Sequence, residues 1–282
     1  MSLAQPGGGM LLATGCPDPR RLGWAALAGA AGFLAVFAAN DLLDVRLDRR
    51  RVVHLHPLEG PDLDSTGGRH PIAEGRLRLV AGVLWVLALG AFALIVSAVL
   101  SRVCVTLFLC AVLLQVLYCR LATVTPYKFL LSGVLVVVGA WAGWFAFSDA
   151  VDPLRLGLFG LWMFAWEIGG RNIPNDLSDL AEDTPLGVRT LPVVLGPRRS
   201  ARVAFVFLVI AAGAGCALAV AAWPSFGLVG LLGMALSALF TLLGPGARLL
   251  RSPEPQVALR TFNRASFHPV CVLVAFGFAV AV

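Results

Sequence analysis

Eight long apolar runs are the feature of this sequence that most limits how the chain can fold. Each run is 17 to 24 residues long and continuously apolar, which suits a helix that crosses a bilayer and not an alternating barrel strand. Only 13% of the 282 residues are charged, against roughly 25% in soluble domains. We therefore predict an all-α integral membrane protein, a bundle of about eight transmembrane helices that forms a single domain over residues 1–282. The runs are residues 23–39, 77–100, 103–121, 129–147, 154–170, 203–222, 225–243 and 265–282.

The segments outside these runs are short or basic. Residues 1–21 contain one apolar patch, at residues 10–13, which is too short for a signal-peptide core or a span, so we expect a flexible N-terminus. The net charge of +6 comes almost entirely from arginines in the loops between the runs. Such a distribution suits anionic lipid headgroups and phosphorylated substrates, and we expect membrane lipid but no nucleic acid as a partner.

An acidic motif follows the first apolar run. If the helix continues, Asn40, Asp44 and Asp48 fall on one face, and Asp41 lies within reach of Asp44. Three carboxylates so close repel one another unless a cation lies among them. Oxygen ligands of this kind suit Mg²⁺, which keeps several waters and is usually completed by substrate phosphates. The alternative is a solvated helix end that binds nothing.

A second motif repeats the same spacing after the fifth run. Asn175, Asp176, Asp179 and Asp183 correspond in order to the four residues of the first motif. A repeated pattern at the ends of two apolar runs is hard to obtain by chance, which argues against the solvated helix end. We therefore predict Mg²⁺ at both motifs. The predicted metal ligands are Asn40, Asp41, Asp44, Asp48, Asp176, Asp179 and Asp183.

Both motifs fall on the same side of the membrane when the runs are threaded alternately. That side carries 18 of the 22 lysine and arginine residues, and loops rich in these residues normally stay in the cytoplasm. We expect the motifs to face the cytoplasm, at a bacterial plasma membrane. Arg20 and Arg21 fall on the opposite side, which leaves two alternatives: the N-terminus folds back, or a further helix precedes the first run.

Several residues near the motifs are candidates for binding phosphate. Arg69 and Arg189 each lie in the loop after one motif, and a guanidinium binds phosphate oxygens in a fork. Glu167 is the one acid well inside a predicted run, and Arg171 and Asn175 follow it on the same helix face. Glu167 is therefore either a functional residue or half of a structural pair with Arg171.

With these residues identified, the chain resembles the UbiA superfamily of intramembrane prenyltransferases. Residues 40–48 resemble the family's NDxxDxxxD signature, and residues 69–75 resemble the R-P-[IL]-x-x-G turn that follows it, with His70 inserted. Residues 175–183 resemble the DxxxD signature, and residues 187–191 match its downstream basic run. The resemblance implies an all-helical bundle, usually of nine spans, around a central cavity open to lipid. It also implies Mg²⁺ at both motifs and a prenyl diphosphate donor.

The chain departs from the family at one basic position. The family often has a lysine four residues after a tyrosine, whereas here Tyr118 is followed at that place by Ala122, so that Arg120 or Lys128 would substitute. The residues implied to bind the diphosphate are Asn40, Tyr118, Lys128, Arg69, Arg171, Asn175 and Arg189. The residues implied to be catalytic are Asp41, Asp44, Asp48, Asp179 and Asp183.

The implied reaction is transfer of a prenyl group to an aromatic or other lipophilic acceptor, with Mg²⁺ neutralising the leaving diphosphate. A dry cavity would protect the allylic cation, and Trp141, Trp144, Trp162 and Trp166 would either line it or only pack and anchor the helices. A terpene cyclase on the same scaffold is an alternative. A divalent-cation transporter is a more distant one, because the motifs lie at helix ends beside arginines that repel a bare cation.

Overall fold

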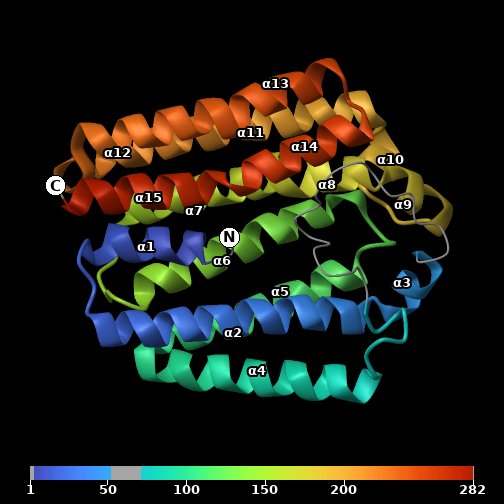
Figure 1. Cartoon of the computed structure of the whole chain (residues 1–282), viewed down its shortest axis with the longest axis horizontal. Coiled ribbons are helices and arrows are strands. Elements are labelled where there is room, and N and C mark those ends of the chain that lie inside the picture. The colour runs from blue at the N-terminus through green and yellow to red at the C-terminus, as the bar shows by residue number, and fades with distance from the viewer. Residues whose placement is uncertain (1–2, 52–70, 282) are drawn as a thin grey trace.

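The computed structural model describes residues 3–51 and 71–281, and within these ranges every regular element is a helix (Figure 1). The predicted all-α membrane fold is confirmed. The α-helices are α1 (Ala4–Thr14), α2 (Pro19–Leu43), α3 (Val45–Arg51), α4 (Leu79–Leu100), α5 (Arg102–Arg120), α6 (Phe129–Phe145), α7 (Pro153–Trp166), α8 (Ile173–Ser178), α9 (Leu180–Leu186), α10 (Leu191–Leu195), α11 (Pro197–Ala221), α12 (Trp223–Ser237), α13 (Gly244–Arg251), α14 (Pro255–Ser266) and α15 (His268–Ala281). A 3₁₀ turn, η2 (Pro126–Lys128), and two π-helical turns, η3 (Glu167–Asn172) and η4 (Ala238–Leu243), join some of them.

Local sequence signals explain where two of the long helices begin. Proline follows an aspartate at the start of α2 and of α7, and the fixed φ of proline suits the first helical position. Asp18 accepts a hydrogen bond from the backbone N–H of Arg21 at 2.8 Å, and Asp152 accepts one from that of Arg155 at 3.0 Å. Both aspartates therefore cap backbone donors that would otherwise lack a partner.

In the part of the chain that is described, seven helical segments are long and apolar enough to cross a membrane, against about eight expected. The segments are Pro19–Leu43, Leu79–Leu100, Arg102–Arg120, Pro126–Phe145, Pro197–Ala221, Trp223–Arg251 and Pro255–Ala281. The expected span at residues 154–170 is helical, but α7 gives way to the π-helical turn η3, which brings Glu167 and Arg171 into the same rod. These charges shorten its apolar length, and the rod packs inside the bundle against α6 and α11.

The N-terminal segment differs from the expected flexible terminus, because residues 4–14 form α1 and pack against α6 and α15. Glycines permit the close approach: a side chain at Gly143 would collide with the backbone of Pro6, and one at Gly9 would lie 2.6 Å from the Ala140 oxygen. Apolar burial and this glycine contact hold α1 against the bundle. Neither can be recognised when a sequence is searched only for apolar runs of membrane-spanning length.

Arg21, at the start of α2, binds the ends of two other helices. Arg21 donates from Nε to the backbone oxygen of Ala146 at 2.6 Å and from Nη2 to that of Leu100 at 3.0 Å. These carbonyls lie at the carboxyl ends of α6 and α4, where helical carbonyls lack partners and positive charge is favourable. Arg21 thus ties three helices together at the end opposite the acidic motifs.

We expect Gly143→Ala to weaken this packing. Because the new methyl group would meet backbone and not a flexible side chain, overpacking should lower the free energy of unfolding by at least about 1–3 kcal/mol. Thermal unfolding in detergent measures the change. Gly213→Ala on α11 is the control, since nothing lies within 4 Å of its added carbon. Equal stability of the two variants would contradict the packing of α1 described above.

Candidate functional site

The two acidic motifs have the same backbone geometry. α2 ends one residue before Asp44 and α3 begins one residue after it, and α8 and α9 flank Asp179 in the same way. The φ and ψ angles are −98° and 5° at Asp44 and −92° and 6° at Asp179. The continuous helix expected through each motif is therefore interrupted at these aspartates. Both lie in the bridge region of φ and ψ, where active-site residues are often found.

Backbone hydrogen bonds are also matched between the motifs. The N–H of Asp44 donates to the oxygen of Asn40 at 2.9 Å, and that of Asp179 donates to the oxygen of Asn175 at 3.0 Å. One turn later, Asp48 and Asp183 donate to the oxygens of Asp44 and Asp179, each at 2.9 Å. The repeat in the sequence is thus a repeat in structure.

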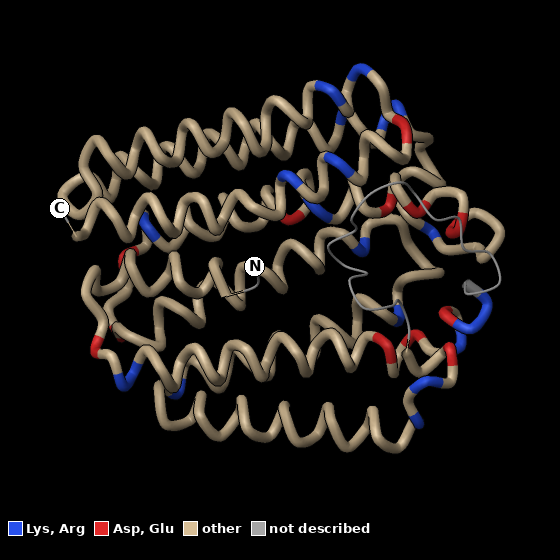
Figure 2. Tube along the Cα trace, in the orientation of Figure 1, with Lys and Arg blue, Asp and Glu red and all other residues tan. Residues whose placement is uncertain are grey.

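The interruptions bring the motifs together at one end of the bundle (Figure 2). α3 packs against α9, and these helices carry Asp48 and Asp183, which are 3% and 2% exposed. Asp176 is also buried, and Asp41, Asp44 and Asp179 are partly exposed. Most of the charged residues in Figure 2 gather at this end, whereas the long helices behind it are nearly free of charge.

The two asparagines have different roles. The Oδ1 atom of Asn40 accepts hydrogen bonds from Gln115 Nε2 at 3.0 Å and from Cys119 Sγ at 3.1 Å, both on α5. Asn175 instead donates from Nδ2 to Oδ2 of Asp179 at 3.2 Å. The oxygen of Asn40 is therefore engaged by α5, whereas Asn175 orients the aspartate of its own motif.

The oxygen atoms of the motifs suit Mg²⁺ if a further ligand, such as a phosphate group, completes its coordination. Among the residues that the structure describes, no group of three or more His, Cys, Asp or Glu side chains is arranged to hold a metal ion. All the acidic donors are carboxylate oxygens, however, and Mg²⁺ usually takes one or two carboxylates together with water and substrate phosphate. The arrangement suits a metal bound jointly with phosphate between the motifs, and not a closed protein cage.

The predicted cationic residues are placed unevenly. Lys128 is buried at the end of η2, with its Nζ atom 5.0 Å from the ring centre of Tyr118. The side chain of Arg189 is exposed, and its backbone N–H donates to the oxygen of Ala122 at 3.0 Å, which joins the loop after the second motif to the loop after α5. Arg69, the other predicted arginine, lies outside the described residues.

A cavity of about 700 Å³ opens beside the motifs. Asn40, Asn175 and Tyr118 line it near the motif end, and its wall continues past apolar side chains as far as Leu22 and Leu100, near the opposite ends of α2 and α4. Its volume lies in the range of roughly 300–1,000 Å³ that is typical of ligand pockets. The cavity therefore has a polar mouth and a long apolar interior.

The four tryptophans do not line this cavity. Trp162 donates from Nε1 to Nε2 of His268 at 3.0 Å, and Trp166 donates to the backbone oxygen of Ala265 at 2.8 Å; both are fully buried. Trp144 donates to the oxygen of Ala150, and Trp141 to that of Leu156. Packing, the second of the two alternatives, describes all four.

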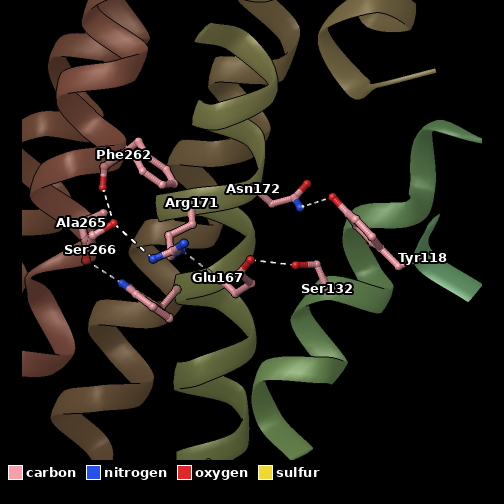
Figure 3. Close-up of polar contacts among 9 residues, drawn as sticks. Tyr118, Ser132, Glu167, Arg171, Asn172, Phe262, Ala265 and Ser266 are labelled. Carbon is pink, nitrogen blue, oxygen red and sulfur yellow. Dashed lines mark hydrogen bonds and ion pairs between the residues drawn. The ribbon is translucent and has the colours of Figure 1, made fainter. Parts of the chain in front are cut away.

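The turn η3 places a polar group in the cavity wall (Figure 3). Glu167 accepts a hydrogen bond from Ser132 Oγ at 2.7 Å and lies 3.5 Å from Nε of Arg171. Asn172 donates from Nδ2 to the hydroxyl of Tyr118 at 3.3 Å. A π-helical turn has five-residue spacing, so Asn172 lies on the cavity side with Glu167.

Sequence reasoning missed three polar residues of this wall: Gln115, Ser132 and Asn172. At the regular helical spacing of 3.6 residues Asn172 would lie away from Glu167, and the π-helical turn instead brings it to the same side. Gln115 and Ser132 stand alone in apolar runs. An isolated polar residue at membrane depth was the one signal that could have found them.

Comparison with known proteins identifies a family that matches the chain. A model of the UbiA prenyltransferase family matches residues 4–268. The digeranylgeranylglyceryl phosphate synthase of Methanoregula boonei is 29% identical over 172 residues, which cover 59% of this chain and 54% of that protein. The chain thus spans about half the length of the curated relative that it matches.

Solved structures resemble the chain over nearly its whole length. An apo UbiA homologue from Aeropyrum pernix has a TM-score of 0.79 at 20% identity, covering 97% of this chain and 94% of that one. A UbiA homologue from Archaeoglobus fulgidus bound to DMAPP and Mg²⁺ has a TM-score of 0.74 at 18% identity, with coverages of 99% and 94%. At these identities the likeness shows a shared fold.

Proposed function

Because the chain belongs to the UbiA prenyltransferase family, we propose that it transfers a prenyl group from a prenyl diphosphate to a lipophilic acceptor inside the membrane, in a reaction that requires Mg²⁺. The observation that carries this proposal is the cavity, whose polar mouth lies beside both acidic motifs and whose interior is apolar. An amphiphile with a charged head and a long apolar tail has the matching shape. A transporter of bare divalent cations would not need an apolar interior.

The diphosphate binds at the motif end. Asp41, Asp44 and Asp48 on one side, and Asp176, Asp179 and Asp183 on the other, would hold Mg²⁺ together with the diphosphate oxygens. When bound, Mg²⁺ supplies Lewis-acid stabilisation of charge on the leaving diphosphate. The Archaeoglobus fulgidus homologue that is bound to DMAPP and Mg²⁺ supports the use of Mg²⁺ together with a prenyl diphosphate.

Neutral and basic groups complete the diphosphate site. With its oxygen held by α5, Asn40 would donate from its amide nitrogen to the diphosphate, and it is therefore assigned as a hydrogen-bond donor in preference to a metal ligand. Lys128 on η2 and Tyr118 on α5 lie against each other beside this site. Arg189 and Arg69 would bind phosphate oxygens from the loops after the motifs.

The prenyl chain occupies the apolar interior. After the C1–O bond to the diphosphate breaks, the allylic cation is captured by an electron-rich atom of the acceptor. The apolar wall keeps water from competing for this cation. The relative from Methanoregula boonei is a digeranylgeranylglyceryl phosphate synthase, which makes a glyceryl phosphate compound one candidate acceptor, alongside aromatic compounds.

We expect each of Asp41→Ala, Asp44→Ala, Asp179→Ala and Asp183→Ala to abolish most turnover. Loss of even an outer-shell partner of a metal ligand costs about 10–100-fold, and a direct ligand should cost at least as much. Release of diphosphate from purified protein measures the rate, and EDTA should stop it until Mg²⁺ is restored. Asp149→Ala, an exposed aspartate at the opposite end, is the control. Near-normal rates in any two motif variants would overturn the site.

A larger side chain in the cavity should make the protein prefer a prenyl diphosphate donor with a shorter chain. Gly139 lines the cavity, and the nearest atom to an added carbon there is 3.9 Å away, in Phe33. Gly139→Leu should therefore lower the kcat/KM ratio of geranylgeranyl to geranyl diphosphate by roughly five- to a hundredfold, since overpacking costs about 1–3 kcal/mol. Gly157→Leu, which points away from any neighbour, should leave the ratio unchanged. An unchanged ratio in both variants would place the prenyl chain elsewhere.

We also propose that the motif end faces the cytoplasm of a bacterial plasma membrane, because threading the apolar runs alternately assigns 18 of the 22 lysines and arginines to that side. Single cysteines at Thr184 and Ala150, which are exposed at opposite ends, test this in a variant without the six native cysteines. A membrane-impermeant maleimide added to intact cells should label Ala150→Cys and spare Thr184→Cys. The reverse pattern would invert the topology.

A further inference from the structure

We propose that Arg21 closes the far end of the cavity and thereby sets an upper limit on the chain length of the prenyl diphosphate donor. This inference rests on the proposed prenyl transfer. It concerns the end of the bundle opposite the acidic motifs. The residues that line the cavity there are Leu22, Leu100, Cys104, Ala146 and Phe147.

Neither the distribution of charge nor the acidic motifs explain the position of Arg21. Alternate threading of the apolar runs places this residue on the side that carries few basic residues, and Figure 2 shows that few charged residues lie at that end of the bundle. An arginine there opposes the usual concentration of basic residues on the cytoplasmic side. A local role that needs a guanidinium would account for it.

The cavity runs along almost the whole length of the bundle. Asn40 and Leu22 line it near the two ends of α2, and at 1.5 Å per residue they lie roughly 27 Å apart. The other lining residues of the far end belong to the carboxyl ends of α4 and α6 and to the first turn of α5. Only the ends of these helices therefore separate the apolar interior from the surroundings.

The guanidinium of Arg21 joins these helix ends. Its Nε atom donates to the backbone oxygen of Ala146 at 2.6 Å, and its Nη2 atom donates to that of Leu100 at 3.0 Å. Both acceptors belong to residues that line the cavity, so the bridge from α2 to α4 and α6 lies across its end. Ala146 and Cys104 are each only 4% exposed, which indicates that this end is covered.

A guanidinium suits this position because it serves two helices at once. The carbonyl groups at the carboxyl end of a helix lack helical partners, and positive charge is favourable there. The planar fork of a guanidinium presents several donors in a fixed arrangement, so it can hold two carbonyl groups at a set separation. An apolar chain that reached this end would have to break two charge-assisted hydrogen bonds in order to pass.

The length of the cavity selects the class of donor. The prenyl chain begins beside the diphosphate, at the level of Asn40, and extends towards Leu22. An extended prenyl unit advances roughly 5 Å, since each of its four chain bonds is about 1.5 Å long. The span of roughly 27 Å therefore holds about five units. A geranylgeranyl chain fits within it, whereas an extended nonaprenyl chain, about 45 Å long, fits only if the end opens.

The test uses the full chain in lipid nanodiscs with Mg²⁺ and two non-cleavable donor analogues, geranylgeranyl thiodiphosphate and nonaprenyl thiodiphosphate. Dissociation constants are expressed as mole fractions of lipid, so that partition of the analogues into the membrane does not enter the comparison. We expect the wild-type protein to bind the longer analogue at least about tenfold more weakly, because even one charge-assisted hydrogen bond corresponds to a factor of about ten.

Arg21→Ala should remove most of this difference, since the end of the cavity then has no bridge. Arg20→Ala is the matched control. Arg20 is the exposed neighbour of Arg21, and its side chain has no hydrogen bond or ion pair to the described residues. The difference between the two analogues should therefore remain in Arg20→Ala.

The outcomes separate this inference from the proposed function. If the wild-type protein binds neither analogue in the presence of Mg²⁺, the proposed function is overturned, and this inference with it. Equal affinity of the wild-type protein for both analogues, or an undiminished difference in Arg21→Ala, would overturn only the role of Arg21. A purely structural Arg21 predicts the second of these results, together with a lower unfolding temperature. If Arg21→Ala does not fold, Arg21→Gln decides by the same comparison, because its shorter side chain can keep at most one of the two hydrogen bonds.

Discussion

The structure depends on one constraint: in a membrane, every backbone N–H and C=O group must find a partner within the protein. Helices meet this demand, and so do π-helical turns such as η4, whose backbone groups pair at five-residue spacing. Other breaks in a helix are tolerated at its ends or where they line a cavity. The interruptions at Asp44 and Asp179 occur at the mouth of the bundle, and the π-helical turn η3 lies in the cavity wall. The candidate site is thus assembled at places where the helical ladder is broken.

Placement of charge follows from the same environment. A charged residue near the middle of a membrane helix costs roughly 2.5–3.5 kcal/mol on insertion scales, so charges gather at the ends unless they have a use or a partner. Both acidic motifs lie at one end (Figure 2), where Mg²⁺ and diphosphate would neutralise them. Among the described residues that line the cavity, Glu167 and Arg171 are the charged ones, and their mutual pairing lowers that cost without removing them from the cavity.

Much of the fold could be predicted from the sequence, since apolar runs and the repeated motif are local signals. The breaks at Asp44 and Asp179 could not, because each needs the packing of α3 against α9 to fix it. The engagement of Asn40 by Gln115 joins residues 75 positions apart, which no spacing rule reveals. The ordered helix α1 depends on the close contact at Gly143. The burial of the tryptophans depends on distant partners such as His268. In each case the structure differs from the sequence-based prediction because residues far apart in the sequence pack together.

The most direct test of the candidate site is an experimental structure of the protein with Mn²⁺ and the non-cleavable analogue geranylgeranyl thiodiphosphate. Anomalous scattering would locate Mn²⁺, which takes the same oxygen ligands as Mg²⁺. We predict metal between Asp44 and Asp179, diphosphate beside it, and the prenyl chain in the cavity towards Leu100. Metal away from both motifs, or a chain lying on the outer surface of the bundle, would contradict the proposed site.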